Sequence, residues 1–99
     1  MVDKESAREL VRVYINQHFD MPGDELVIID EETLNKPYGW VFFYCSRKFL
    51  ETNDPEYMVG GNAPILVCKK DGTFHFLGTA LPAADAIIQI EQELQLNKL

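Results

Sequence analysis

The sequence predicts an α+β fold: a four-stranded antiparallel sheet with N- and C-terminal helices packed on one face, in the order α-β-β-β-β-α. Residues near each end repeat apolar side chains with the period of a helical face, and strand-sized apolar runs lie between them. Asp71-Gly72 separates two of these runs as a hairpin turn. Because an antiparallel sheet can leave its second face to solvent, both helices are expected on the first.

The first helix is expected over residues 3–19, where apolar side chains fall on one face and charged side chains fill the other. The apolar positions are Ala7, Leu10, Val11, Tyr14, Ile15 and His18 or Phe19. Pro22 and Gly23 follow the last turn, where such residues commonly end a helix.

Two strands are expected in the first half of the chain. Residues 26–29 form a short apolar run that leads into an acidic triplet, and residues 40–45 form the most apolar run of the sequence. Alternation in the second run places Trp40, Phe42 and Tyr44 on one face and Val41, Phe43 and Cys45 on the other. Both faces then need cover, so this strand is expected to be central.

The clearest predicted hairpin joins residues 65–70 to residues 73–78 through a two-residue type I′ turn. The expected pairs are Lys70 with Thr73, Cys68 with His75 and Leu66 with Leu77 on one side, and Val67 with Phe76 and Lys69 with Phe74 on the other. Residues 47–64 are expected to be a loop with at most a short helix around residues 55–59.

The last helix is expected to begin at Pro82, with an apolar stripe formed by Ala83, Ala86, Ile87, Ile90 and Leu94. The periodic segments together predict which side chains form the core. They are Leu10, Val11, Tyr14, Phe42, Val67, Phe76, Ile87 and Ile90.

The composition is that of one globular domain, and residues 1–99 are expected to form it, with 46% hydrophobic residues. Nine basic against sixteen acidic side chains give a net charge of −7, which disfavours nucleic acid and anionic membranes as ligands. A basic protein partner is favoured, although such a charge can also serve solubility alone. The N-terminal residues lack the features of a signal peptide, which predicts a cytoplasmic protein.

No catalytic residue, cofactor or metal site is expected. Cys68 and His75 would form a nucleophile and base only if the predicted register brought them together, and they lie on regular strands without an oxyanion loop or a third orienting group. Cys45 and Cys68 have no metal-ligand spacing and are expected to be reduced thiols within apolar runs.

Carboxylates concentrated in the predicted loops are the candidate partner-binding residues, although loop carboxylates are often simply solvated. They are Asp30, Glu31, Glu32, Glu51, Asp54 and Glu56, with Tyr57 as an aromatic anchor beside them. A basic surface on a partner would relieve the repulsion between these like charges.

Four segments resemble, in their order and spacing, the YrhB-like, immunity protein 35 family. They are Gly39-Trp40-Val41-Phe42-Phe43-Tyr44, Phe49-Leu50-Glu51-Thr52-Asn53-Asp54, Gly61-Asn62-Ala63-Pro64-Ile65-Leu66-Val67 and Leu77-Gly78-Thr79-Ala80. Asn53 stands where that family tends to carry glycine, and asparagine can still adopt the left-handed conformation.

The resemblance implies a bacterial cytoplasmic protein that is encoded near polymorphic-toxin genes and neutralises its cognate toxin by binding it. It also implies an alternative, because one YrhB-like member is regarded as heat-stable and chaperone-like. A chaperone-like holdase needs accessible apolar surface. The sequence shows acidic loops and no stripe that is expected to be apolar and exposed, which favours the immunity function.

Overall fold

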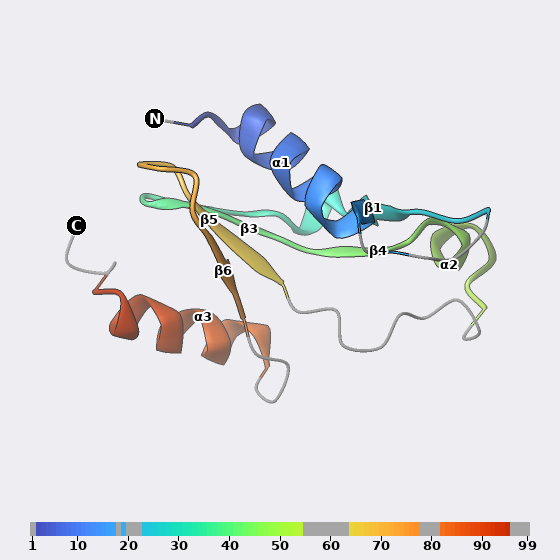
Figure 1. The fold of residues 1–99 in the computed structure, drawn as a ribbon. Helices are drawn as coiled ribbons and strands as arrows, with labels where there is room; N and C mark the ends of the chain where they lie inside the picture. Colours follow the sequence, from blue (N-terminus) through green and yellow to red (C-terminus); the bar gives the residue numbers. More distant parts are fainter. Residues whose placement is uncertain (1, 18, 20–22, 55–63, 78–81, 96–99) are drawn as a thin grey trace.

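The computed structural model describes residues 2–17, 19, 23–54, 64–77 and 82–95. The elements, in chain order, are helix α1 (Lys4–Gln17), strand β1 (Leu26–Ile28), the 3-10 helix η1 (Asp30–Glu32), strands β2 (Leu34–Lys36), β3 (Gly39–Phe42) and β4 (Tyr44–Ser46), helix α2 (Arg47–Thr52), strands β5 (Ile65–Cys68) and β6 (Phe74–Phe76), and helix α3 (Ala83–Glu93) (Figure 1). The predicted α+β class, with helices near both ends and antiparallel strands between them, is confirmed.

The strands form two antiparallel sheets where a single four-stranded sheet was predicted. The larger sheet has the order β2-β3-β5-β6, and β1 pairs with β4 in a separate ribbon. The division occurs at Phe43, because the run predicted as one strand is interrupted there and becomes β3 and β4. The Phe43 carbonyl accepts a hydrogen bond of 2.9 Å from the Ile29 amide, so the second half of the run pairs with β1. β3 lies between β2 and β5 and is central, as predicted.

Helix α1 packs on one face of the larger sheet through Ala7, Val11 and Ile15. These side chains meet Phe42 and Val67 together with other buried residues of β1 and β5. The buried stripe is narrower than predicted, since Leu10 is 47% exposed and Tyr14 is 38% exposed. Asp3 begins the helix, because its carboxylate accepts a hydrogen bond of 2.7 Å from the Ser6 amide.

Helix α3 packs on the opposite face of the sheet from α1, so the prediction that both helices share one face is wrong (Figure 1). Its buried side chains Ala86 and Ile87 contact a second cluster that includes Val41 and Leu66. The physical reason lies in β5, where three consecutive residues have no exposed surface. Successive strand residues point to opposite faces, and each face therefore needs its own helix.

The β5–β6 hairpin has a register two residues away from the predicted one: Ile65 pairs with Phe76, Leu66 with His75 and Val67 with Phe74. Residues 69–73 connect the two strands, and in this connection the Gly72 amide donates to the Cys68 carbonyl at 2.7 Å, with Gly72 at a φ of 74°. A shift of two residues preserves the face on which each side chain lies. The predicted division of the hairpin side chains between the two faces therefore survives the change.

Two side chains attach the helices to β1 and to the turn between β2 and β3. The Asn16 amide donates to the Leu26 carbonyl at 2.9 Å and accepts from the Leu26 amide at 2.8 Å, which satisfies both backbone groups of a buried strand residue. The buried Tyr38 donates from its hydroxyl to the Glu91 carboxylate on α3 at 2.7 Å. The second pair links segments that are 53 positions apart in the sequence.

Helix α2 lies where a loop was predicted. Ser46 caps its start, accepting a hydrogen bond of 3.2 Å from the Phe49 amide, and Asn53 ends it with a φ of 56°. Asparagine is a residue that can adopt this left-handed conformation, as noted for Asn53 from the sequence. The short helix predicted around residues 55–59 lies outside the described residues.

We predict that Phe42→Ala costs about 3–5 kcal/mol of unfolding free energy, because that ring is fully buried between α1 and the sheet. Phe76 was predicted to be a core residue, but it is 51% exposed, so Phe76→Ala should cost no more than about 1.5 kcal/mol. Chemical denaturation of both variants measures the difference. Equal losses of stability would contradict the burial seen here.

We predict that Gly39→Ala destabilises the protein by about 3 kcal/mol or more, because a Cβ at this position would lie 1.9 Å from the Val67 carbonyl oxygen. Gly23→Ala is the control: Gly23 also has a positive φ, but its Cβ would meet only the flexible end of Lys48. That variant should lose only about 1–2 kcal/mol from backbone strain. Thermal melts of the two variants compare them, and a Gly39→Ala protein as stable as the control would refute the close strand approach.

Candidate functional site

Cys68 and His75, which the predicted register placed directly opposite each other, are not paired in the structure, although both interact with Thr73, whose hydroxyl oxygen lies 3.4 Å from the His75 Nε2 atom. Cys68 lies across from Thr73, whose carbonyl accepts the Cys68 amide hydrogen bond, and His75 lies across from Leu66. Burial raises the pKa of the Cys68 thiol, and a hydrogen bond with Thr73 offsets this in part. A thiol held in its neutral form is a poor nucleophile at neutral pH.

The part of the chain that the structure describes contains neither a candidate metal site nor a candidate membrane-spanning helix. No group of three or more histidine, cysteine or acidic side chains is placed to hold a metal ion there. None of the described helices is long and apolar enough to cross a membrane.

We predict that Cys68, isolated in a Cys45→Ala variant, is alkylated by iodoacetamide more slowly at pH 7 than a free cysteine derivative. Its raised pKa means that the thiolate fraction, and hence the rate, increases only as the pH rises above the range of an ordinary thiol. Mass spectrometry of the time course from pH 6 to pH 10 measures the rate, with pH values chosen to span the ordinary thiol pKa of about 8.5. Rapid labelling below neutral pH would contradict the assignment.

The first group of candidate carboxylates lies in η1, which connects β1 to β2. Asp30 accepts two hydrogen bonds from the Arg8 guanidinium, at 2.7 and 3.1 Å, and this contact holds the pKa of Asp30 below its ordinary value. Glu31 and Glu32 are exposed and form no ion pair with a described residue. The two glutamates are therefore accessible to a partner, whereas Asp30 helps to attach η1 to α1.

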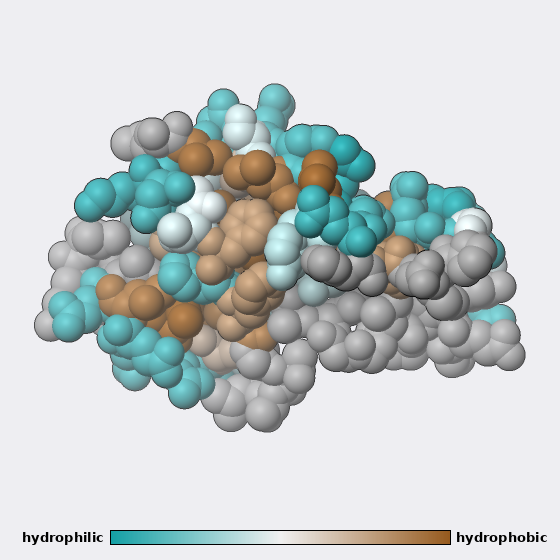
Figure 2. Space-filling view, viewed as in Figure 1, coloured by the Kyte–Doolittle hydropathy of each residue, from teal (hydrophilic) through white to brown (hydrophobic). Residues whose placement is uncertain are grey.

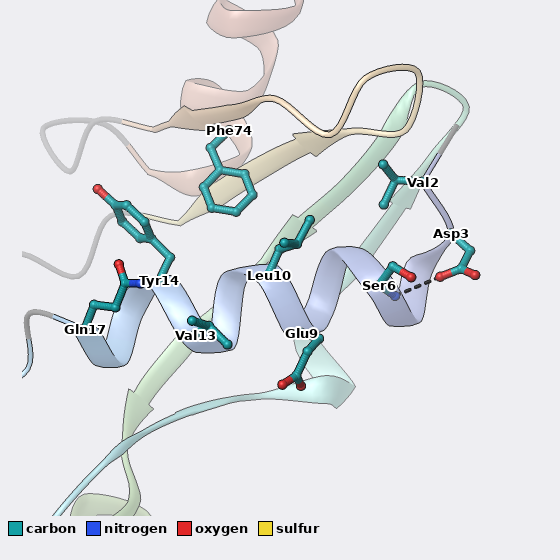
Figure 3. A pocket seen from close by; sticks show the side chains of 9 residues that line it. All are labelled: Val2, Asp3, Ser6, Glu9, Leu10, Val13, Tyr14, Gln17 and Phe74. Carbon is teal, nitrogen blue, oxygen red and sulfur yellow. Dashed lines mark hydrogen bonds between the residues drawn. The ribbon is translucent and has the colours of Figure 1, made fainter.

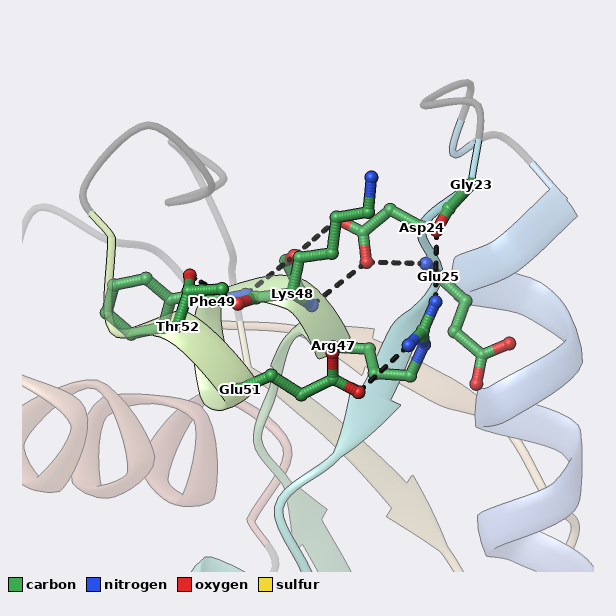
Figure 4. A network of polar contacts seen from close by, with 9 residues as sticks. Gly23, Asp24, Glu25, Arg47, Lys48, Phe49, Glu51 and Thr52 are labelled. Carbon is green, nitrogen blue, oxygen red and sulfur yellow. Dashed lines mark hydrogen bonds and ion pairs between the residues drawn. The ribbon is translucent and has the colours of Figure 1, made fainter.

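The second group of candidate carboxylates lies at α2 (Figure 4). Glu51 is paired with Arg47 at 2.9 Å within the same helix, and Arg47 also donates to the Gly23 carbonyl at 3.0 Å. Asp54 is half-buried just after the helix. Glu56 and Tyr57 lie outside the described residues.

Asp24, which was not a candidate, is the centre of the polar network at α2 (Figure 4). Its carboxylate accepts hydrogen bonds from the Ser46 hydroxyl and from the backbone amides of Lys48 and Glu25. Partial burial acts to raise the pKa of Asp24, but these three hydrogen bonds outweigh it and hold that pKa below its ordinary value. The network joins the start of α2 to the segment before β1 and so has a structural role.

The structure does not gather the two acidic groups into one cluster. In the β1–β4 ribbon, Ile28 pairs with Tyr44 and Leu26 pairs with Ser46. The η1 carboxylates follow the first of these pairs, and α2 follows the second. The groups therefore lie at opposite ends of the ribbon (Figure 1).

An exposed apolar surface lies between α1 and β6, where the sequence predicted none. Leu10, Val13, Tyr14 and Phe76 are each between 38% and 51% exposed. The Tyr14 ring lies 5.6 Å from the Phe74 ring and 5.5 Å from the Phe76 ring, measured between centroids. Figure 2 shows apolar side chains gathered on this face of the molecule.

This surface contains a groove of about 690 Å³, which we call the α1–β6 groove (Figure 3). It is lined by Val2, Asp3, Ser6, Glu9, Leu10, Val13, Tyr14, Gln17 and Phe74. The sequence did not predict this groove, because its apolar period placed Leu10 and Tyr14 in the core. The apolar arc of α1 is wide enough to have signalled a second contact surface, since Val13 lies beside that arc.

Comparison with known proteins gives the family. The model of the family described as immunity protein 35 matches residues 5–93. The chain belongs to the immunity protein 35 family. An Escherichia coli K12 protein named "Uncharacterized protein YrhB" is 42% identical to it over 53 residues, which are 54% of this chain and 56% of that protein. The chain thus matches little more than half the length of this relative, and no solved structure matches it.

Membership in the immunity protein 35 family confirms the predicted resemblance and points to a protein that acts on a protein partner. The geometry is compatible with such a role. The described surface offers exposed carboxylates at η1 and an apolar groove beside α1, and its two thiols both have pKa values raised by burial.

Proposed function

We propose that this chain is a cytoplasmic immunity protein that binds and neutralises a cognate polymorphic toxin. The observation that carries the proposal is the family match, which spans nearly the whole chain. Binding is sufficient for this function, because a toxin whose active surface is covered is inactive without any chemical step by its inhibitor.

The charge supports a toxin with a basic surface. A net charge of −7 attracts cationic partners and speeds their association when the ionic strength is low. We propose the loop carboxylates as the groups that meet this surface: Asp30, Glu31, Glu32, Glu51, Asp54 and Glu56, with Tyr57 beside them. Within this set Glu31 and Glu32 have the strongest support, since both are exposed and neither is used in an ion pair with a described residue.

A second candidate function is that of a chaperone-like holdase. The exposed apolar side chains beside β6 favour it, because a holdase binds unfolding proteins through such surface. The two functions differ in specificity. A holdase suppresses the aggregation of unrelated, thermally unfolding enzymes, whereas an immunity protein binds its own folded toxin with a defined stoichiometry.

We predict that co-expression of this chain rescues cells from the toxin domain encoded beside its gene. The double variant Glu31→Lys/Glu32→Lys should associate about tenfold more slowly at low salt, because it replaces the attraction near η1 by repulsion. Asp85→Lys/Glu93→Lys makes the same change in net charge on the exposed surface of α3 and serves as the matched control. Stopped-flow association rates at two salt concentrations measure the effect.

Equal slowing by the two double variants would show that only net charge matters and would remove η1 from the interface. Absence of rescue and of binding by the unaltered chain would contradict the immunity function. Suppression of aggregation of an unrelated enzyme in that case would favour the holdase.

A further inference from the structure

β6 is the last strand of the larger sheet and pairs only with β5 among the described elements. The Cys68 amide donates to the Thr73 carbonyl, and the Leu77 amide donates to the Pro64 carbonyl. Since bonded and non-bonded pairs alternate in an antiparallel ladder, the backbone groups of Phe74 and Phe76 point away from β5. Two amides and two carbonyls therefore lie along an edge of the sheet that no other described strand pairs with.

The opposite edge of the same sheet carries residues that discourage strand pairing, and the three residues of β6 are not of that kind. The outer strand β2 carries Lys36 and is followed by Pro37, two residues that discourage pairing with another strand. β6 consists of Phe74, His75 and Phe76, without a charged side chain of fixed sign or a proline. A strand edge of aromatic residues is a surface suited to strand addition.

The α1–β6 groove lies on the same side of the molecule as this edge. The Phe74 and Phe76 rings point to the α1 face, where both contact Tyr14. A strand added beside β6 would lie about 4.8 Å from it, and alternate side chains of that strand would face α1. Those side chains would meet Leu10 and Val13, which are 47% and 43% exposed.

The charge around the groove indicates which kind of binding partner the groove can accept. Its lining includes the carboxylates of Asp3 and Glu9 and no lysine or arginine, although Glu9 is paired with Arg12 nearby. A second copy of the chain would bring another −7 charges to this surface. An extended segment with alternating apolar side chains and basic flanking residues fits both the groove and the charge.

We propose that β6 and the α1–β6 groove together bind an extended segment of the toxin, which adds to the sheet as a further strand. This inference rests on the proposed function, because it assigns the segment to the toxin. Backbone hydrogen bonds from Phe74 and Phe76 hold the segment in register, and its apolar side chains are buried against Leu10, Val13 and Tyr14. The η1 carboxylates act on the rate of encounter, whereas the groove determines the rate of dissociation.

The side-chain part of the proposal is tested with Val13→Asp, in which a charge enters the groove at a position that is 43% exposed. Ile88→Asp is the matched control, since Ile88 is 52% exposed on α3, across the sheet. Both proteins should keep their melting temperatures. Val13→Asp should dissociate from the toxin domain encoded beside the gene at least about tenfold faster, and Ile88→Asp should behave as the unaltered chain.

The backbone part is tested with Phe76→Pro against Phe76→Ala. Both lose the ring, but only proline removes the outward amide, and that amide does not pair with β5. Phe76→Pro should dissociate about tenfold faster than Phe76→Ala. If Phe76→Pro does not fold, hydrogen exchange in the unaltered complex decides the point, because strand addition must protect the amides of Phe74 and Phe76.

A toxin that binds the unaltered chain, Val13→Asp and Phe76→Pro equally would overturn this inference and leave the immunity function in place. Free chain that sediments as a dimer, and as a monomer after Val13→Asp, would also overturn it, because the occupant would then be a second copy.

If the toxin does not bind at all, the proposed function fails, and a peptide of alternating lysine and valine decides the groove proposal. That peptide should protect the Phe74 and Phe76 amides and bind at least about tenfold more tightly than its glutamate–valine counterpart. Absence of that protection would overturn the proposal.

Discussion

Burial of β5 on both of its faces is the constraint on which the arrangement of the molecule depends. Ile65, Leu66 and Val67 have no exposed surface, and alternation along the strand sends them to opposite sides of the sheet. Ile65 and Val67 join the cluster under α1, and Leu66 joins the cluster over α3. A sheet with an apolar strand of this kind is stable only between two layers, so the terminal helices must lie on opposite faces.

The position of α1 in turn explains why one apolar surface remains exposed. Asn16 holds the helix to β1, and Arg8 holds it to η1, so both polar attachments lie on the side away from β6. The stripe through Val11 then faces the sheet, and Leu10 and Tyr14 extend over the β6 edge. Three-residue β6 is too short to cover them. The groove is thus a consequence of how the helix is anchored.

The sequence correctly predicted the properties that depend on how apolar side chains alternate along a single strand. Alternation assigned Trp40, Phe42 and Val41 to the correct faces, although the strand is broken at Phe43. The choice of strand partners depends on distant residues and was not predictable in this way. The hairpin register differs from the prediction because the chain turns over residues 69–73 and Val67 pairs with Phe74, whereas a two-residue turn would have paired Lys69 with Phe74. Asp71-Gly72 identifies a turn in the sequence, but these two residues do not fix the length of the loop around them.

The candidate binding residues also divide into those that the sequence could predict and those that it could not. The exposed carboxylates of Glu31 and Glu32 could be predicted, since charge and a loop position suffice, but the groove depends on which part of an apolar arc the tertiary structure buries. Because the groove is exposed, the net charge of −7 also affects whether identical chains associate with one another. Aromatic side chains beside a strand edge such as that of β6 promote association between identical chains, and like charge opposes that association while leaving a cationic partner free to approach. An acidic protein can therefore keep such a strand edge available for a basic partner. An uncharged protein of the same fold would have a greater tendency to aggregate through that edge.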